Sequence, residues 1–128
     1  MTAAAGALVV DDNRLNSCLV HIFLARLGVP VHVVDSGAQA LEALKRDTFC
    51  LVVLDLHMPR MSGEQVCSII RQVPGLQLLP VVAYTAHRMP DERARLQSAG
   101  FTDLMTKPMS FADVKRLCVG LGIGRACG

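Results

Sequence analysis

The sequence predicts an α/β fold, in which a parallel sheet of five strands carries helices on both faces. Short apolar runs alternate with stretches of helical period along the chain, as in repeated strand–helix units. One run, CLVVLD, is apolar without alternation, which is typical of a strand buried on both faces of a parallel sheet. The 128 residues, 52% of them hydrophobic, are enough for one core. We expect a single domain over 1–128, with a core from about 7 to 121 and a short frayed tail.

The first half of the chain contains two strand–helix units. ALVVD (7–11) predicts a first strand, and the apolar spacing after it predicts a helix over 14–27 that a glycine ends. VHVV (31–34) predicts a short second strand, followed by a helix over 36–46 that a serine caps. In the first helix, the positions expected to face the core are Leu15, Cys18, Leu19, Ile22, Phe23 and Leu27; in the second they are Leu41 and Leu44.

The second half begins with the most apolar strand and adds three more helices. Serines at the expected starts of two of these helices, and Pro-Gly or Gly at the ends of two, mark their limits. The expected elements are strands over 50–55, 80–85 and 102–106 and helices over 62–73, 89–99 and 110–121. The positions expected to face the core are Val66, Ile69, Ile70 and Val73 in the third helix and Val114, Leu117, Cys118 and Leu121 in the last.

The strand order follows from the same pattern. The first and third strands are the most apolar and should be central, which gives a flavodoxin-like (βα)5 sheet of order 2-1-3-4-5 with right-handed crossovers. In such a sheet, ligands bind beyond the carboxyl ends of the strands, where the order reverses. The residues at or just after these ends are Asp11, Asp12, Asp55, Thr85 and Lys107.

Composition excludes several classes of function. The formal net charge is only +2, and no run of Lys or Arg occurs, so neither nucleic acid nor a membrane surface is an expected partner. The N-terminal residues lack the basic region and long apolar run of a signal peptide or membrane span. The five cysteines are odd in number and indicate buried free thiols in a reducing compartment, with Cys127 as an exposed exception. We expect a cytoplasmic protein, or a nuclear one in a eukaryote.

Three carboxylates at one edge of the sheet require a countercharge. Asp11, Asp12 and Asp55 offer oxygen ligands, which Mg²⁺ prefers, and no His or Cys cluster has the spacing of a transition-metal site. Mn²⁺ should be able to substitute. Helix capping could instead account for the Asp11–Asp12 pair, but it requires one aspartate rather than two.

Asp55 differs from the other two because it ends the most apolar strand. A carboxylate can act as a nucleophile toward phosphorus if the phosphoryl charge is neutralised. Lys107 and Thr85 would supply an ammonium and a hydroxyl, and the small Ala86 leaves room for phosphoryl oxygens. Pro108 could direct Lys107 back over the sheet through a cis peptide bond. Alone, Lys107 could be a solvated surface lysine and Thr85 a strand-end hydroxyl; their joint placement favours the phosphoryl site.

Four segments, VVDDN, VVLDLHMPRMSG, VVAYTAH and DLMTKPMS, resemble the signature segments of the response-regulator receiver domain of two-component signalling. The resemblance extends from about 7 to 121 and is greatest to receivers of hybrid histidine kinases and multistep phosphorelays. It implies a phosphoacceptor, Asp55, that receives its phosphoryl group from a histidine kinase or a histidine-containing phosphotransfer protein. It also implies self-catalysed transfer and autodephosphorylation rather than an enzyme acting on a separate metabolite.

The resemblance assigns the remaining roles residue by residue. Asp12 would bind Mg²⁺ directly and Asp11 partly through water, with the backbone carbonyl of His57 completing the protein ligands. Thr85 would be the switch hydroxyl and Lys107 the cation that pairs with the phosphoryl group. His57 and His87 would flank that group and influence its hydrolysis, although both could equally be ordinary exposed loop histidines.

One departure from the family concerns the strand-five aromatic that reports movement of the switch hydroxyl. Leu104 occupies its position, and Tyr84, next to Thr85, should point to the opposite face of the sheet. Leu104 therefore favours a monomer that passes its phosphoryl group onward. We expect the partner to dock on a rim formed by Asn13, Leu15, Asn16, Met58, Pro59, Pro108 and Met109.

Two other functions remain open. A pseudo-receiver would keep the fold as an interaction module without cycling phosphate, and the intact site residues argue against it. A magnesium phosphohydrolase is disfavoured because His57 stands two residues after Asp55, where many phosphatases have a second acid.

Overall fold

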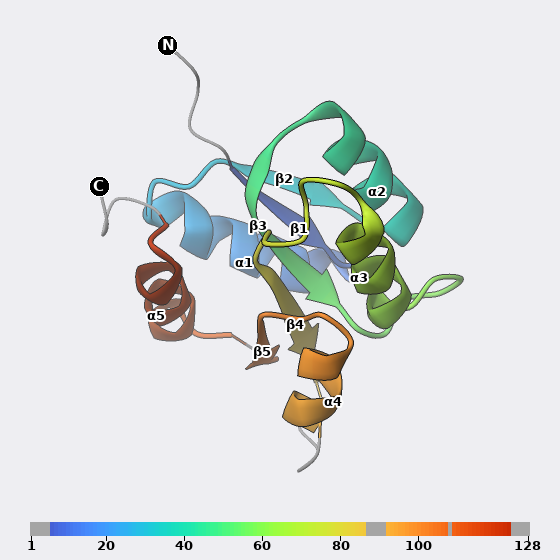
Figure 1. Ribbon diagram of the computed structural model, residues 1–128. Helices are drawn as coiled ribbons and strands as arrows, with labels where there is room; N and C mark the ends of the chain where they lie inside the picture. Colours follow the sequence, from blue (N-terminus) through green and yellow to red (C-terminus); the bar gives the residue numbers. More distant parts are fainter. Residues whose placement is uncertain (1–5, 87–91, 108, 124–128) are drawn as a thin grey trace.

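The computed structural model describes residues 6–86, 92–107 and 109–123. They form one parallel sheet in the order β2-β1-β3-β4-β5 (Figure 1), which confirms the predicted fold. The strands are β1 (Gly6–Val10), β2 (Val31–Val34), β3 (Phe49–Asp55), β4 (Val81–Thr85) and β5 (Asp103–Thr106). The helices are α1 (Arg14–Arg26), α2 (Gly37–Arg46), α3 (Gly63–Gln72), α4 (Glu92–Ser98) and α5 (Phe111–Leu121). The expected start of the fourth helix, at 89, lies outside the described residues.

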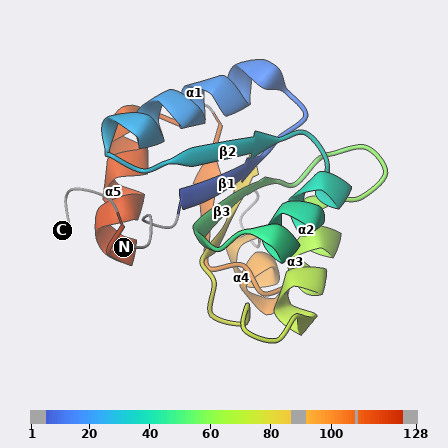
Figure 2. The ribbon, with the colours of Figure 1, turned by 90° about the horizontal axis from the view of Figure 1, so that it is seen from above.

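The sheet separates two apolar layers. Helix α1 lies on one side of it, and α2 and α3 lie on the other (Figure 2). In β1, Leu8 and Val10 belong to the core cluster beneath α2, α3 and α4, whereas Ala7 and Val9 belong to the cluster beneath α1 and α5. Both faces of β1 and β3 are therefore covered, which explains why these strands are continuously apolar.

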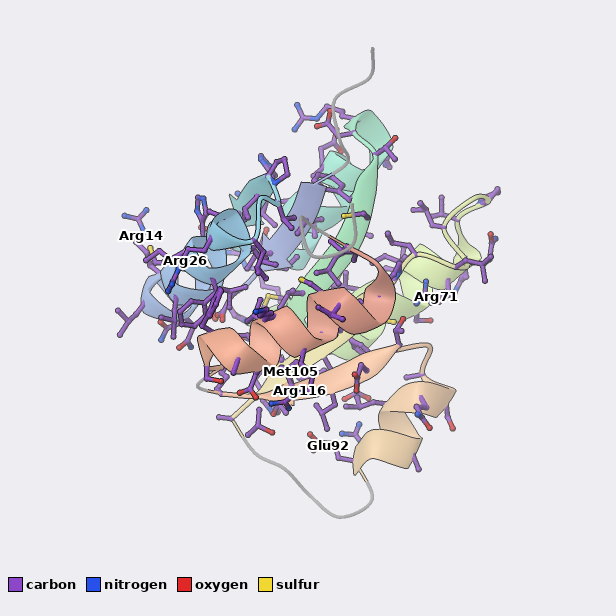
Figure 3. All side chains as sticks on the ribbon, turned by 90° about the vertical axis from the view of Figure 1, so that its left-hand side faces the viewer. Arg14, Arg26, Arg71, Glu92, Met105 and Arg116 are labelled. Atoms are coloured by element: carbon purple, nitrogen blue, oxygen red, sulfur yellow. The ribbon has the colours of Figure 1, made fainter. Side chains whose placement is uncertain are left out.

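The predicted buried face of α1 is confirmed only in part. Leu27 is buried, and Phe23 packs partly buried against the core cluster beneath α1 and α5. Three other predicted positions are wrong. Leu15 is 81% exposed and Ile22 55% exposed, and Cys18 is also exposed; Ser17, Val20 and Leu24 are buried instead. Apolar residues surround much of this helix, so their spacing did not determine which face is buried. The buried serine is tolerated because its hydroxyl donates a hydrogen bond to the Arg14 carbonyl at 3.1 Å. Arg14 and Arg26 are exposed on α1 (Figure 3), and the guanidinium of Arg26 lies over the Phe111 ring of α5, 4.3 Å from its centroid.

The other helices require a smaller correction. In α3, Val66 and Ile70 are buried as predicted, but Cys67 is the third large buried side chain, whereas Ile69 and Val73 are each 38% exposed. In α2, Leu41 and Leu44 pack partly buried against the core. In α5, Val114, Leu117 and Cys118 are buried, and Leu121 packs beside them.

The predicted serine caps are confirmed. Ser36, Ser62 and Ser110 each accept a hydrogen bond from the backbone N–H three residues later, which satisfies one free donor at each helix start. The thiols of Cys67 and Cys118 are buried and that of Cys50 is partly buried, but Cys18 is exposed, contrary to the expectation that Cys127 would be the exposed exception. Cys127 lies outside the described residues. Among the helices described, none is long and apolar enough to cross a membrane.

Candidate functional site

Three carboxylates meet at the carboxyl edge of the two central strands. Asp55 is the last residue of β3, and Asp11 and Asp12 directly follow the neighbouring strand β1. Their carboxylate oxygens lie within 4.8 Å of one another. Asp11 and Asp55 are buried, at 2% and 3% exposure, and Asp12 is exposed. The parallel register of β1 and β3 thus assembles the acidic cluster that the sequence predicted.

Helix capping does not account for these aspartates. The N-cap of α1 is Asn13, whose side chain accepts a hydrogen bond from the Asn16 N–H at 3.1 Å. Asp11 instead accepts a bond from the Asn13 N–H on Oδ1, at 2.8 Å. Its other oxygen, Oδ2, is buried with no hydrogen bond from any described residue and faces the Lys107 Nζ at 3.4 Å. A buried carboxylate oxygen with so little compensation points to a cation.

The environment of Asp11 holds its proton unusually tightly. Burial raises the pKa of Asp11 from 3.8 to about 6, and the Asp55 charge adds to this effect. The Asn13 N–H and the Lys107 ammonium lower the pKa of Asp11 but do not compensate fully. In the absence of a further cation, an ionised Asp11 therefore costs the folded state free energy.

Lys107 supplies one positive charge to the cluster. Its Nζ lies 3.2 Å from Asp55 Oδ1 as well as 3.4 Å from Asp11 Oδ2. Burial acts to lower the pKa of Lys107, but the two carboxylates outweigh it, so the pKa of this lysine is raised and it stays charged. Among the residues that the structure describes, this one ammonium faces three carboxylates, which leaves excess negative charge. The all-oxygen donor set and this charge excess fit a hard divalent cation such as Mg²⁺.

Two further predicted residues, His57 and Ala86, line an open cleft beside Asp55. Its volume is about 400 Å³, and its lining consists of Asp12, Asn13, Asn16, Asp55, His57, Ala86 and Lys107. Thr85 is fully buried at the end of β4, and its carbonyl accepts a 2.7 Å hydrogen bond from the Lys107 N–H. His57 is exposed, and its backbone N–H donates to Asp55 Oδ1 at 3.1 Å. The predicted neighbours His87 and Pro108 lie outside the described residues.

Two predicted members of the docking rim are misplaced. Met58 and Met109 are buried, at 9% and 2% exposure, because each packs into one of the two core clusters. Leu15, Asn13 and Pro59 are exposed, so the exposed part of the described rim lies at the start of α1 and in the loop after β3.

The face assignments of Leu104 and Tyr84 are confirmed. Leu104 packs in the cluster beneath α2, α3 and α4, and Tyr84 packs in the cluster beneath α1 and α5. The sequence did not predict that the Lys107 Nζ would lie 4.8 Å from the centroid of the Tyr84 ring.

Gly63 is a second residue that sequence analysis missed. Helix α3 begins so close to Asp55 that a Cβ on Gly63 would overlap the Asp55 carbonyl oxygen and lie 2.9 Å from Leu56 Cα. The Gly63 N–H donates to the Leu56 carbonyl at 3.2 Å. The glycine at the end of MPRMSG was the available signal, because glycine permits such close backbone approach.

Gly63→Ala is therefore expected to destabilise the fold by about 1–3 kcal/mol, because rigid backbone must move to admit the methyl group. Urea unfolding measures this change. Gly120→Ala is the matched control: Gly120 lies in α5, and no atom of the described residues lies within 4 Å of the added Cβ, so the substitution should stabilise the fold by about 0.5–1 kcal/mol. Equal effects of the two alanines would contradict the close approach.

The fold and this cleft together define a class of signalling domain, and comparison with known proteins agrees. Residues 7–118 match the family model for the response regulator receiver domain. The chain belongs to that family.

Two curated relatives are histidine kinases. Sensor histidine kinase GacS of Pseudomonas protegens is 41% identical over 110 residues, which cover 84% of this chain and 12% of GacS. Signal transduction histidine-protein kinase BarA of Escherichia coli K12 is 39% identical over 106 residues, covering 83% of this chain and 12% of BarA. The chain thus spans about an eighth of the length of these relatives.

Solved structures agree with the fold. The chemotaxis protein CheY4 of Vibrio cholerae has a TM-score of 0.87 at 23% identity, covering 93% of this chain and 99% of that one. The receiver domain of sensor histidine kinase PA1611 from Pseudomonas aeruginosa PAO1 has a TM-score of 0.83 at 27% identity, covering 94% and 99%. That structure has a magnesium ion coordinated in its active site cleft.

Proposed function

We propose that this chain is a phosphoacceptor receiver domain in a His–Asp phosphorelay, which takes a phosphoryl group from a phosphohistidine onto Asp55 and signals or relays it. The observation that carries the proposal is the position of Asp55. Its carboxylate ends a buried strand, lies within 4.8 Å of two further carboxylates and faces an ammonium at 3.2 Å. Family membership and the similarity to histidine kinases support the same function.

The proposed reaction transfers the phosphoryl group from a histidine nitrogen to the Asp55 carboxylate. An Asp55 carboxylate oxygen attacks phosphorus, the N–P bond of the phosphohistidine breaks, and the imidazole leaves with the bonding electrons. Lys107 pairs with the phosphoryl oxygens, and the Thr85 hydroxyl donates to them. Asp11, Asp12, Asp55 and the His57 carbonyl would hold Mg²⁺, which would supply further neutralisation of phosphoryl charge.

Beryllofluoride binding tests this proposal against the pseudo-receiver alternative. With Mg²⁺ present, the wild-type chain should bind beryllofluoride saturably, as detected by ¹⁹F NMR, and binding should disappear in EDTA. Absence of binding at any Mg²⁺ concentration would favour the pseudo-receiver. Hydrolysis of a free phosphate ester with many turnovers would instead favour the phosphohydrolase.

The partner is expected to dock over the start of α1. Leu15 is 81% exposed, and its neighbours Asn13 and Asn16 line the cleft, so a phosphohistidine that reaches Asp55 brings its protein against this helix end. An exposed leucine beside a functional cleft suits such an interface. We infer that the partner is a histidine kinase or a histidine-containing phosphotransfer protein.

Leu15→Asp should slow phosphotransfer from a phosphohistidine protein about tenfold, the effect of losing an apolar anchor, while sparing transfer from acetyl phosphate. An acid in the first turn of α1 is favourable for the helix itself. Ile22→Asp, at another exposed apolar position of α1, is the matched control and should leave both rates unchanged. Equal slowing with both donors would contradict the docking model.

A further inference from the structure

Tyr84 and Lys107 make a contact that the proposed roles do not use. The Lys107 Nζ lies over the Tyr84 ring, 4.8 Å from its centroid. We propose that Tyr84 is a positioning residue, whose aromatic face holds the Lys107 ammonium over the cleft between Asp11 and Asp55. The inference rests on the proposed function, because the position of Lys107 matters only if phosphoryl oxygens arrive there.

The contact has the features of a strong cation–π interaction. The Tyr84 ring is fully buried, and the Lys107 side chain is only 15% exposed. Such contacts strengthen when water is excluded. Both partners are also fixed through their backbones: the Lys107 N–H donates to the Thr85 carbonyl at 2.7 Å, and the Tyr84 carbonyl accepts from the Leu56 N–H at 3.3 Å. The ring and the ammonium are therefore held on adjoining strand ends.

The contact of Lys107 with the Tyr84 ring differs from its contacts with carboxylates, because the ring contact is kept when the charge of the site changes. Asp11 and Asp55 hold the ammonium at 3.4 and 3.2 Å, but a bound cation would compete for both carboxylates, and phosphorylation would consume one of them. The quadrupole of Tyr84 is unaffected by either event. The ring thus gives the ammonium a constant position as its anionic partners change.

Core packing alone does not account for a tyrosine at this position. Within the part of the chain that the structure describes, its buried hydroxyl has no hydrogen-bond partner of acceptable geometry. Burial raises the pKa of Tyr84, and the nearby backbone of Met109 lowers it by less. A leucine would fill the same layer without burying a polar atom. The face of the ring, rather than its hydroxyl, is the part that meets Lys107.

A double-mutant cycle on beryllofluoride affinity in Mg²⁺, measured by ¹⁹F NMR, tests the inference. Tyr84→Leu should weaken binding about tenfold in the wild-type background, the scale of a desolvated cation–π contact. It should have less than about a twofold effect in the Lys107→Ala background. Tyr84→Phe should restore most of the lost affinity. Phe101→Leu, which truncates a buried aromatic of the other core cluster, should be additive with Lys107→Ala.

A series of fluorinated side chains at position 84 tests the same inference even if the Tyr84→Leu variant does not fold. Phenylalanine carrying zero to three ring fluorines at position 84 changes packing little and weakens the ring quadrupole stepwise. Affinity should fall progressively, by about three- to tenfold over the series; a flat response, or additivity in the cycle, overturns the role of Tyr84. If the wild-type chain itself binds no beryllofluoride in Mg²⁺, the proposed function fails first, and the two failures are therefore distinguishable.

Discussion

Asp55→Asn is expected to reduce phosphorylation by a phosphohistidine donor or acetyl phosphate to background. The amide is nearly isosteric with the carboxylate but is not a nucleophile toward phosphorus. Its oxygen can still accept the His57 N–H, which lies 3.1 Å from Asp55 Oδ1, so the fold should survive. Incorporation of ³²P that hydroxylamine releases, with circular dichroism on the same samples, measures both effects.

The matched control for this variant is Asp47→Asn. Asp47 is exposed at the C-cap of α2, at the opposite edge of the sheet from the cleft, and its replacement should leave labelling at the wild-type level. Full labelling of Asp55→Asn would refute the assignment. Labelling that survives in Asp55→Asn and is lost in Asp12→Asn would move the phosphoacceptor to the exposed carboxylate.

The sheet was predictable because its central strands are buried on both faces. A continuous apolar run such as 50–55, between turn residues, is typical of a central parallel strand, and serine caps fixed the starts of three helices. The buried face of α1 was not predictable from spacing. Leu15 and Val20 are both apolar, and packing of the helix against β1 and α5 determines that Val20 is the buried one. Ser17 can be buried on the same face because its hydroxyl bonds to the backbone of its own helix.

The site was predictable to the same degree. Residues at the carboxyl ends of parallel strands must meet, so the convergence of Asp11, Asp55 and Lys107 followed from strand order. The contacts of Tyr84 and Gly63 did not follow, because they depend on the path of one lysine side chain and on how closely α3 approaches Asp55. Met58 and Met109 were misplaced because a flexible apolar side chain beside a cleft can turn into the core instead.

Asp11→Asn should give opposite changes in stability and activity. The raised pKa of Asp11, about 6 against 3.8, means that the folded state retains a proton which the unfolded state releases. Without metal, this carboxyl therefore makes the free energy of unfolding fall as pH rises from about 4 to about 6, by up to about 3 kcal/mol. Asparagine removes that titration. The free energy of unfolding of the variant should therefore rise relative to that of the wild type from about pH 4 to about pH 6, while Mg²⁺-dependent phosphorylation is lost.

Urea unfolding in EDTA from pH 4 to pH 7.5 measures the free energy of unfolding of Asp11→Asn and of the wild type. The titration of other groups largely cancels in the difference between the two values. The difference should be smallest near pH 4 and reach a plateau above pH 6. Added Mg²⁺ at pH 7 should stabilise the wild type by mass action and the variant far less, because the cation relieves the charge that burial penalises. Asp47→Asn, remote from the cleft, shows whether loss of any aspartate produces the same profile. A difference that stays constant from pH 4 to pH 7.5 would show that burial does not penalise the charge of Asp11 and that this carboxylate needs no cation.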